Sequence, residues 1–403
     1  MTPQAPPSPL APMPHPPILL LDPSLFTLPF DIHFARGLAA EGAEVHLAGR
    51  PLRPYERLAG EPLIFHPLFY RLGERGAVGW HPSQARRALK GLEHLFGYLR
   101  LARLIAGTGI GVLHVQWLLL PLLDRPLLSR LRSRVRLFLT VHNADLLAHS
   151  VEVVAGRFVR LLQAVGRREL LALFDGFIAH TEKTTDHLSR LGIERRRILL
   201  LPHPPLALAP GLLAATGKAD GPPHILFFGA IKPYKGVDVL VEAALRLVAR
   251  GRLFTLTLAG RPYFDLAPLL ARVQAAGARD RFRFELDYVP DERLDGLLRQ
   301  ADLVVFPYRE IDGSGALALA ASYGKAIVAS RIGVFAEPPV ADRVALVEPE
   351  DVDGLAAVLD RLLADPAARA ALARRAAGLA AELGDWRAYA RACLAFYAAT
   401  SSR

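Results

Sequence analysis

The most constraining feature of this sequence is a regular alternation of short apolar runs with amphipathic stretches, and this alternation occurs twice. From residue 18 onward the apolar runs are ILLL, AEVHLAG, VLHVQW, RLFLTVHN and DGFIAHT. The residues 204–223 break the pattern with proline and glycine, and it then restarts with HILFFGA, LFTLTLAG, FRFELDYV, DLVVFPY, AIVAS and ALVEP. Buried strands that alternate with helices are typical of parallel sheets with helices on both faces. We therefore expect an α/β protein with two doubly wound, Rossmann-like domains in series.

The breaks in this pattern predict the domain boundaries. A chain of 403 residues is long enough for two domains of ordinary size. The expected parts are a proline-rich disordered leader, a first Rossmann-like domain, a linker, a second Rossmann-like domain and a last helix that packs back on the first domain. These parts cover residues 1–17, 18–205, 206–222, 223–383 and 384–403.

Composition limits the cellular setting. The single cysteine, Cys393, cannot form a disulfide framework, which favours a reducing compartment. The leader contains eight prolines and lacks the charged and apolar regions of a secretion signal. No apolar run approaches the ~20 residues that span a bilayer. We expect a cytoplasmic protein that associates, if at all, with the inner face of the membrane.

The positive charge is concentrated in the first half of the chain. Residues 1–205 hold 25 Lys and Arg against 16 Asp and Glu, whereas the rest of the chain is nearly balanced. Residues 86–136 carry ten basic residues and two acids, Glu93 and Asp124. Part of this stretch places Leu89, Leu92, Leu95, Phe96, Leu99 and Ala102 at helical spacing, which predicts a helix with a basic outer face. Such a surface attracts the phosphates of lipid or nucleic acid, or is a solvated face without a partner.

The stretch FFGAIKPYKGVDVL, residues 227–240, predicts a phosphate site. A strand ends at Gly229, a turn carries Lys232 and Lys235, and a helix starts near Val237. Ammonium groups then stand beside the free N–H groups of a helix N-terminus, an arrangement that favours anions. The stretch matches neither the Walker loop nor the GxGxxG fingerprint, and the alternative is two solvated surface lysines.

A second loop, PYREIDGSG, follows the strand DLVVFPY. Ser314 is a candidate N-cap for a helix that starts near Gly315. Glu310 and Asp312 lie just before that helix, so one loop offers carboxylates for sugar hydroxyls and N–H groups for phosphate. The alternative is a capped helix with two solvated acids.

The order of these segments resembles a known family. FFGAIKPYKG, LAGRPYF, DYVPDERLDGLLRQADLVVFPY, SGALALAASYGKAIVAS and RIGVFAE are similar to the retaining glycosyltransferases of family four, which have the GT-B fold. HVQW, TVHN, IAHTEKTTDHL and LPH extend the resemblance into the first half. It implies an acceptor-binding first domain and a nucleotide-sugar-binding second domain that face a cleft.

The resemblance also implies residue roles. Lys235 and Lys232 would hold the donor pyrophosphate near Gly229, and His142 would lie beneath the transferred sugar. The other donor-binding residues would be Gly260 and Arg261 at the diphosphate, Tyr288 and Val289 at the base, and Ser314 and Gly315 at the helix start. No cofactor and no metal are implied, because the chain lacks a clear Asp-x-Asp motif in a donor loop.

One departure concerns the paired glutamates of the family. Alignment on Gly324 puts Ile311 and Leu319 at the two glutamate positions. A Ser-Gly form of this motif resembles a subgroup of the same family. Either Glu310 or Asp312 would replace the first glutamate, and we rank Asp312 slightly lower.

Three histidines and the adjacent residues Gln116 and Trp117 are further candidate site residues. His142, His180 and His203 follow or end expected strands, and His142, which Asn143 could orient, is the preferred catalytic residue. Gln116 and Trp117, together with His180, are expected to contact the acceptor. A packed core tryptophan is the alternative interpretation of Trp117.

These features predict transfer of a hexosyl unit from a nucleotide diphosphate sugar to a glycan or lipid-linked acceptor, with retention, in cell-surface polysaccharide or glycolipid synthesis. An anionic membrane surface is a further expected partner. The alternatives are a catalytically silent sugar- or nucleotide-binding protein on the same fold, a nucleotide-sugar epimerase or sugar phosphorylase, and a nucleic-acid binder. The last is disfavoured because no recognised DNA or RNA module is present.

Overall fold

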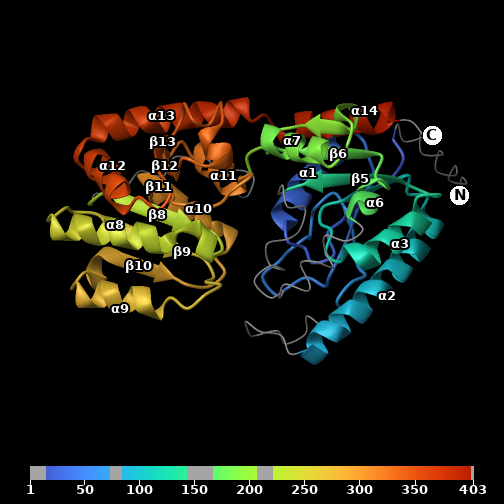
Figure 1. Ribbon diagram of the computed structural model, residues 1–403, viewed down its shortest axis with the longest axis horizontal. Helices are drawn as coiled ribbons and strands as arrows, with labels where there is room; N and C mark the ends of the chain where they lie inside the picture. Colours follow the sequence, from blue (N-terminus) through green and yellow to red (C-terminus); the bar gives the residue numbers. More distant parts are fainter. Residues whose placement is uncertain (1–14, 73–83, 143–166, 207–220, 401–403) are drawn as a thin grey trace, which may run out of the picture. The chain divides into compact units, whose positions relative to one another are not determined.

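The computed structural model describes residues 15–72, 84–142, 167–206 and 221–400 (Figure 1). The chain divides into two compact units. The first contains Met1–Ala179, Thr185–Leu200 and Trp386–Arg403, and the second contains His180–Thr184 and Leu201–Asp385. The leader and linker predictions fall largely on residues 1–14 and 207–220, outside the described residues.

In the described residues, the first unit is built on a parallel sheet of seven strands in the order β3-β2-β1-β4-β5-β6-β7. Two edge strands, β3 and β7, are short and were not expected from the sequence. The strands are β1 Ile18–Leu21, β2 Val45–Gly49, β3 Ile64–Pro67, β4 Val112–Val115, β5 Arg136–Val141, β6 Gly176–Ala179 and β7 Ile198–Leu200. The helices of this half of the sequence are α1 Leu28–Ala40, α2 Gln84–Thr108, α3 Pro121–Leu131, α6 Arg167–Leu171 and α7 Glu182–Arg190, with a 3-10 turn at Arg195–Arg197.

The strand order reverses between β1 and β4, which pair in parallel with Leu21 opposite Val115. In open parallel sheets, ligands bind at the carboxyl ends of the strands at such a switch point. Asp22 follows β1 and Gln116 follows β4, so both side chains lie at this point.

The second unit has a parallel sheet in the order β10-β9-β8-β11-β12-β13, which confirms the second doubly wound domain. Its strands are β8 His224–Phe228, β9 Thr255–Ala259, β10 Phe282–Glu285, β11 Leu303–Phe306, β12 Ala326–Ser330 and β13 Ala345–Val347. Its helices are α8 Val237–Ala249, α9 Ala267–Ala275, α10 Asp291–Gln300, α11 Gly315–Ser322, α12 Val352–Ala364 and α13 Pro366–Glu382, with 3-10 turns at Pro233–Lys235, Arg279–Arg281 and Gly333–Ala336.

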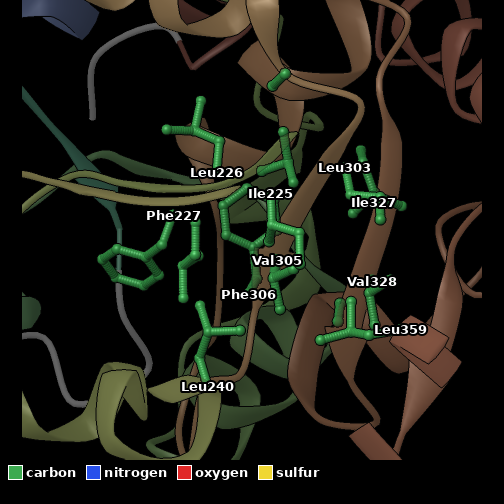
Figure 2. Close-up of a cluster of buried hydrophobic side chains, with 14 of the residues drawn as sticks. Ile225, Leu226, Phe227, Leu240, Leu303, Val305, Phe306, Ile327, Val328 and Leu359 are labelled. Carbon is green, nitrogen blue, oxygen red and sulfur yellow. The ribbon is translucent and has the colours of Figure 1, made fainter. Parts of the chain in front are cut away.

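The core of the second unit explains why its strands read as unbroken apolar runs. Both faces of the central strands are covered, so Ile225, Phe227 and Val305 are all fully buried. Figure 2 shows these side chains packed with Leu240 and Leu359, which come from helices. Continuous burial of this kind is the main stabilising contribution to such a domain.

The last helix, α14 Trp386–Ala399, belongs to the first unit and packs on α1 (Figure 1). A Cβ at Gly37 of α1 would come 2.2 Å from the carbonyl oxygen of Trp386, so only glycine permits this approach. The hydroxyl of Tyr397 bonds to Nδ1 of buried His114, whose Nε2 bonds to Thr140 Oγ1 at 2.6 Å. Buried hydrogen bonds therefore join α14 to β4 and β5.

The helix predicted around residues 86–105 exists as α2, and its described exposed face is more apolar than predicted. Leu89, Leu92, Leu95, Phe96 and Leu99 are exposed there together with Arg103, and the side chains of Arg86 and Arg87 lie outside the described residues. The buried face instead carries polar groups: His94 Nε2 donates to Asp124 Oδ1 of α3 at 2.6 Å, and His94 Nδ1 bonds to the Tyr70 hydroxyl at 2.6 Å. The two acids of the basic stretch are both turned inward, because Glu93 accepts from the Leu72 N–H at 2.8 Å. Hydrogen bonds that must be satisfied inside the protein set the rotation of this helix.

No helix in the described parts of the chain is long and apolar enough to cross a bilayer.

Removal of the Tyr397 hydroxyl tests the docking of α14. We expect Tyr397→Phe to lower the free energy of unfolding by about 1–3 kcal/mol, because a buried hydrogen bond to His114 is lost. Urea unfolding measures this change. The control is Arg391→Gln on the same helix, which removes a surface ion pair with Glu41 and should lower the free energy of unfolding much less, because exposed ion pairs contribute little. Equal costs for the two variants would contradict the structural role of the buried bond.

Candidate active site

The phosphate site predicted at residues 227–240 is an enclosed turn in the second unit. β8 ends at Phe228, and Gly229 adopts φ 103°, a conformation that favours glycine. The side chain of Lys235 folds back over this glycine, because a Cβ placed there would lie 3.3 Å from Nζ. Its ammonium group also lies 5.2 Å from the centre of the Tyr308 ring, and Lys232 Nζ lies 5.6 Å from that of Tyr263.

Enclosure changes the proton affinity of both lysines. Burial and, to a smaller extent, the nearby charge of Lys232 lower the pKa of Lys235 to about 7. Burial also lowers the pKa of Lys232. No ion pair joins either lysine to a carboxylate in the described residues. Among the described residues, the turn therefore holds two half-buried lysines without a carboxylate partner, and an anionic ligand would stabilise the charged form of both.

The second predicted loop, PYREIDGSG, lies directly against this turn. A Cβ at Gly236, which has φ 60°, would come 1.9 Å from the carbonyl oxygen of Pro307. Ser314 caps α11 by accepting from the Leu317 N–H at 3.1 Å, and α11 starts at Gly315 as predicted. The structure thus places the start of this loop against the lysine turn, and the serine-capped helix follows at the other end of the loop.

Arg309 ties the two loops to each other, and the sequence analysis missed it. Its guanidinium donates to both carboxylate oxygens of Asp238, at 2.9 and 2.7 Å, and to the carbonyl oxygen of Pro233 at 2.8 Å. Its backbone N–H donates to the backbone carbonyl oxygen of Tyr234 at 2.7 Å. These bonds hold the turn in place from outside. Asp238 lies in the first turn of α8, but nothing in the sequence identified its partner.

The two candidate carboxylates have different surroundings. Asp312 accepts from Lys183 Nζ at 2.5 Å, and Lys183 lies in the short segment His180–Thr184 that groups with the second unit. Glu310 is exposed. The pKa of Tyr234 is raised to about 12, mainly by burial and in addition by the negative charge of Glu310. Glu310 therefore lies near the lysine turn.

The remaining donor candidates line the adjacent strand ends. Gly260 has φ 148°, and a Cβ there would come 2.0 Å from the carbonyl oxygen of Gly229, so the two glycines form a close backbone contact. Arg261 is exposed and pairs with Asp287 at 2.7 Å. Tyr288 is exposed, whereas Val289 packs against the core.

His180 belongs to a different group from the other acceptor candidates. It lies 5.4 Å, ring to ring, from His203, which lies 3.3 Å from the Cβ position of Gly315. Burial lowers the pKa of His180 to about 4, and its Nδ1–H donates to the carbonyl of Leu201 at 3.0 Å. A neutral imidazole therefore lies near the start of α11 in the second unit.

In the first unit, Gln116, Trp117 and His142 meet at the carboxyl ends of β4 and β5. His142 Nε2–H donates to Gln116 Oε1 at 3.0 Å, and its ring stacks on Trp117 at 4.9 Å with an angle of 18°. Phe30 contacts the same ring edge-on at 4.9 Å. Asn143, proposed to orient His142, lies outside the described residues, and Gln116 is the orienting partner that the structure shows.

A pair of buried carboxyl groups, also missed from the sequence, lies behind this cluster. Trp117 Nε1–H donates to Thr27 Oγ1, and Thr27 donates from its N–H and its hydroxyl to Asp22 Oδ2. Burial raises the pKa of Asp22 to about 6, and burial together with Asp22 raises that of Asp31 well above its usual range. Two buried carboxylates close together cannot both ionise at low cost, which favours a protonated form of the pair. Asp22 fixes Trp117 through Thr27.

The contact between Gly236 and Pro307 predicts that a side chain at position 236 destabilises the protein. We expect Gly236→Ala to lower the free energy of unfolding by about 1–3 kcal/mol more than Gly251→Ala, because only the first variant overlaps a carbonyl oxygen. Both glycines have positive φ, and the Cβ of Gly251 would meet nothing within 4 Å. Denaturant unfolding of both variants measures the difference. Equal destabilisation would show that backbone strain alone accounts for the effect.

The lowered pKa of Lys235 predicts a pH-dependent effect. The pKa of Lys235 is about 7 in the folded protein, whereas its ordinary pKa is 10.5. Between these two pH values the unfolded chain binds more protons at this lysine than the folded chain. The lysine therefore lowers stability most at low pH, and the penalty is relieved as the pH rises through this window. We expect Lys235→Met to stabilise the ligand-free protein, with a larger gain near pH 7 than near pH 10. A gain independent of pH in thermal unfolding would contradict this.

Comparison with known proteins identifies the family. Residues 222–365 match the family described as "Glycosyl transferases group 1", and residues 33–204 match "Glycosyl transferase 4-like domain". The D-inositol 3-phosphate glycosyltransferase of Xylanimonas cellulosilytica is 32% identical over 305 residues, covering 71% of this chain and 69% of that protein. The lipopolysaccharide core biosynthesis mannosyltransferase LpcC of Rhizobium leguminosarum is 32% identical over 49% of this chain and 57% of its own length.

Solved structures show the same fold. Sucrose-phosphate synthase from Thermosynechococcus elongatus has a TM-score of 0.71 at 18% identity, over 96% of this chain and 99% of its own. HepE of Anabaena, in complex with UDP and glucose, has a TM-score of 0.64 at 15% identity, over 96% of this chain and all of its own. Together with the paired parallel sheets and the loops at their carboxyl ends, these matches show that the chain belongs to the group 1, family-four-like glycosyltransferases of the GT-B fold.

Proposed function

We propose that the protein transfers a hexosyl unit from a nucleotide diphosphate sugar to a glycan or lipid-linked acceptor, with retention of anomeric configuration, in cell-surface polysaccharide or glycolipid synthesis. The observation that carries this proposal is the pair of enclosed lysines, Lys232 and Lys235, without a carboxylate partner in the described residues. Relatives named as inositol phosphate glycosyltransferase and mannosyltransferase support the reaction class. A structural neighbour bound to UDP and glucose supports the donor class.

In the proposed reaction, the leaving nucleoside diphosphate gains negative charge as the glycosidic bond breaks. Lys235 and Lys232 meet that charge, together with the N–H groups at the start of α11 near Gly315. Donor binding also shifts Lys235 toward its charged form, because an anion restores the proton affinity that burial removes. We propose that the diphosphate is neutralised by these groups, without a cofactor or a metal.

An acid of the loop PYREIDGSG and His142 are both proposed to act on the transferred sugar. Glu310 is the preferred carboxylate to stabilise oxocarbenium character, because Asp312 already accepts from Lys183. The leaving phosphate assists attack on the same face, so no protein nucleophile is required. Gln116, Trp117 and His180 contact the acceptor, and Gly260, Arg261, Tyr288 and Val289 border the diphosphate and base.

A nucleotide screen and one charge removal test this proposal. We expect one of UDP, GDP or ADP to raise the melting temperature of the wild type, because a ligand of the folded state stabilises it. The nucleotide sugar of that base should be hydrolysed slowly. Lys235→Ala should abolish the thermal shift and lower kcat/KM by about 100-fold or more.

The matched control is Arg272→Ala, which also removes one positive charge, from an exposed pair with Glu242 on the outer helices of the same unit. It should leave binding and hydrolysis unchanged. Nucleotide binding without hydrolysis or transfer would support the catalytically silent binding protein, which the apolar residues Ile311 and Leu319 in place of the glutamates favour. The absence of any shift with all three nucleotides would overturn the proposal.

A further inference from the structure

The second unit contains an open cavity that the proposed reaction does not use. It lies between α12, α13 and the start of β13, and the two helices are neighbours (Figure 1). Its volume is about 590 Å³, which is within the range of small-molecule sites. We call it the arginine cavity, because its lining holds three arginines, five apolar residues and no acid: Arg361, Arg374 and Arg375, with Ala345, Leu362, Ala368, Ala371 and Leu372.

Short side chains on one face of α13 leave room for this cavity. Ala368, Ala371 and Leu372 recur at helical spacing, and Arg375 follows them on the same face. Leu372 is buried, and so is Leu362 of α12, so these two leucines close the bottom of the cavity. The arginines, in contrast, are exposed. The cavity therefore has an apolar floor and positively charged groups at its opening.

The arginines of the cavity differ from their neighbours because they lack a carboxylate partner. Arg369, on the same helix, pairs with Asp302, and Arg343 pairs with Glu382 at the end of that helix. Among the residues that the structure describes, none of the three cavity arginines takes part in an ion pair or a hydrogen bond. Their positive charge is therefore available to a ligand.

The acids of the surrounding segment are already engaged elsewhere. From Ala345 to Glu382, each acid either pairs with an arginine outside the cavity or caps a helix. The pairs are Glu348 with Arg331, Glu350 with Arg309, Asp353 with Arg246, Asp360 with Arg252 and Glu382 with Arg343, and the caps are Asp351 and Asp365. The segment that forms the cavity thus supplies no counter-ion for it.

The chemistry of the lining indicates the class of ligand. Guanidinium groups are weakly hydrated and bind phosphate or carboxylate through paired hydrogen bonds. Three of them around one cavity favour a ligand with more than one negative charge. A phosphate monoester carries nearly two charges at neutral pH, whereas a carboxylate carries one. The apolar floor, in turn, favours a ligand whose phosphate is attached to an apolar group.

The arginine cavity and the lysine turn lie at opposite edges of the second sheet. Ala345 is the first residue of β13, whereas the lysine turn follows the last residue of β8, and the strands are parallel. α12 starts beside Glu350, which pairs with Arg309, and it runs away from that pair to Arg361 in its last turn. The cavity is therefore a separate site from the proposed donor site.

We propose that the arginine cavity binds a small organic phosphate monoester as a second ligand of this protein. Arg361, Arg374 and Arg375 hold the phosphate, and the apolar group of the ligand lies on the floor of alanine and leucine side chains. The ligand is bound without a covalent step. This inference goes beyond the proposed transfer reaction and does not rest on it.

Calorimetric titration with phenyl phosphate tests the site. The parent protein is Lys235→Met, in which the lysine turn has lost one of its two charges. Phenyl phosphate should bind about tenfold more tightly than benzoate, which has one charge fewer, and than inorganic phosphate, which lacks the ring. Adding Arg361→Gln and Arg375→Gln to the parent should weaken phenyl phosphate binding about tenfold or more, because glutamine keeps the helices but removes both guanidinium groups.

The matched control adds Arg250→Gln and Arg283→Gln to the same parent. These substitutions also remove two positive charges from exposed arginines of the second unit, but neither residue lines the cavity. The control should bind phenyl phosphate like the parent. Equal binding by the two double variants, or no binding of phenyl phosphate by the parent, would overturn the proposal.

A longer side chain on the floor tests the apolar part of the site. Ala371→Leu keeps the helix and fills part of the cavity, so it should reduce the preference for phenyl phosphate over inorganic phosphate. The binding of inorganic phosphate itself should change little, because the arginines are intact. An unchanged preference, or a parent that binds both phosphates equally well, would contradict a site with an apolar floor.

The nucleotide thermal shift separates this inference from the proposed function. In the wild-type background, Arg361→Gln with Arg375→Gln should keep the nucleotide shift, because the cavity lies at the other edge of the sheet. Weaker phenyl phosphate binding with an intact nucleotide shift supports the arginine cavity. Loss of both would show that the double variant damages the protein, and the two single variants must then weaken phenyl phosphate binding with an intact shift for the proposal to stand. A wild type without any nucleotide shift would overturn only the proposed function.

Discussion

The candidate donor site depends on the desolvation of one ammonium group, that of Lys235. A lysine at this depth is costly without a counter-ion, and its pKa near 7 expresses that cost. The surrounding turn holds it there because Gly229 and Gly236 adopt backbone conformations that admit no Cβ, and because Arg309 clamps the turn to the next loop. The site is thus preorganised for an anion: the protein has met the cost of placing the charge before the ligand arrives.

In the first unit as well, buried polar groups determine the positions of other side chains. Buried polar groups are tolerated only when they are hydrogen-bonded, and the partners they require determine how helices rotate. His94, Asp124 and Tyr70 satisfy one another beneath α2, and in doing so they direct five large apolar side chains to the outside. At the switch point, Asp22 and Thr27 hold Trp117 against His142 by a similar chain of bonds. Polar networks in this unit therefore determine which side chains are exposed on α2 and how Trp117 and His142 lie at the switch point.

Much of the fold follows from local pattern, because strands buried on both faces must be apolar along their whole length. The runs of β1, β4, β5 and β8 to β13 were expected for that reason and are confirmed. The edge strands β3 and β7 were missed, since an edge strand has fewer buried positions and Ile64 is in fact exposed. The glycines and lysines of the turn after β8 were recognisable in the sequence because they lie within a few residues of one another.

The sequence by itself determined the two parallel sheets, the lysine turn after β8 and the capped start of α11, because each arises from residues close together in the chain. Only the tertiary structure decided that Arg309 joins two loops, that Asp22 and Asp31 are both buried near Trp117, and that α2 turns its leucines outward. These features depend on pairs of residues far apart in the chain, such as His94 with Asp124 and Arg309 with Asp238. Helical periodicity shows that a helix has two faces, but the hydrogen-bond partners available in the folded protein determine which face is buried.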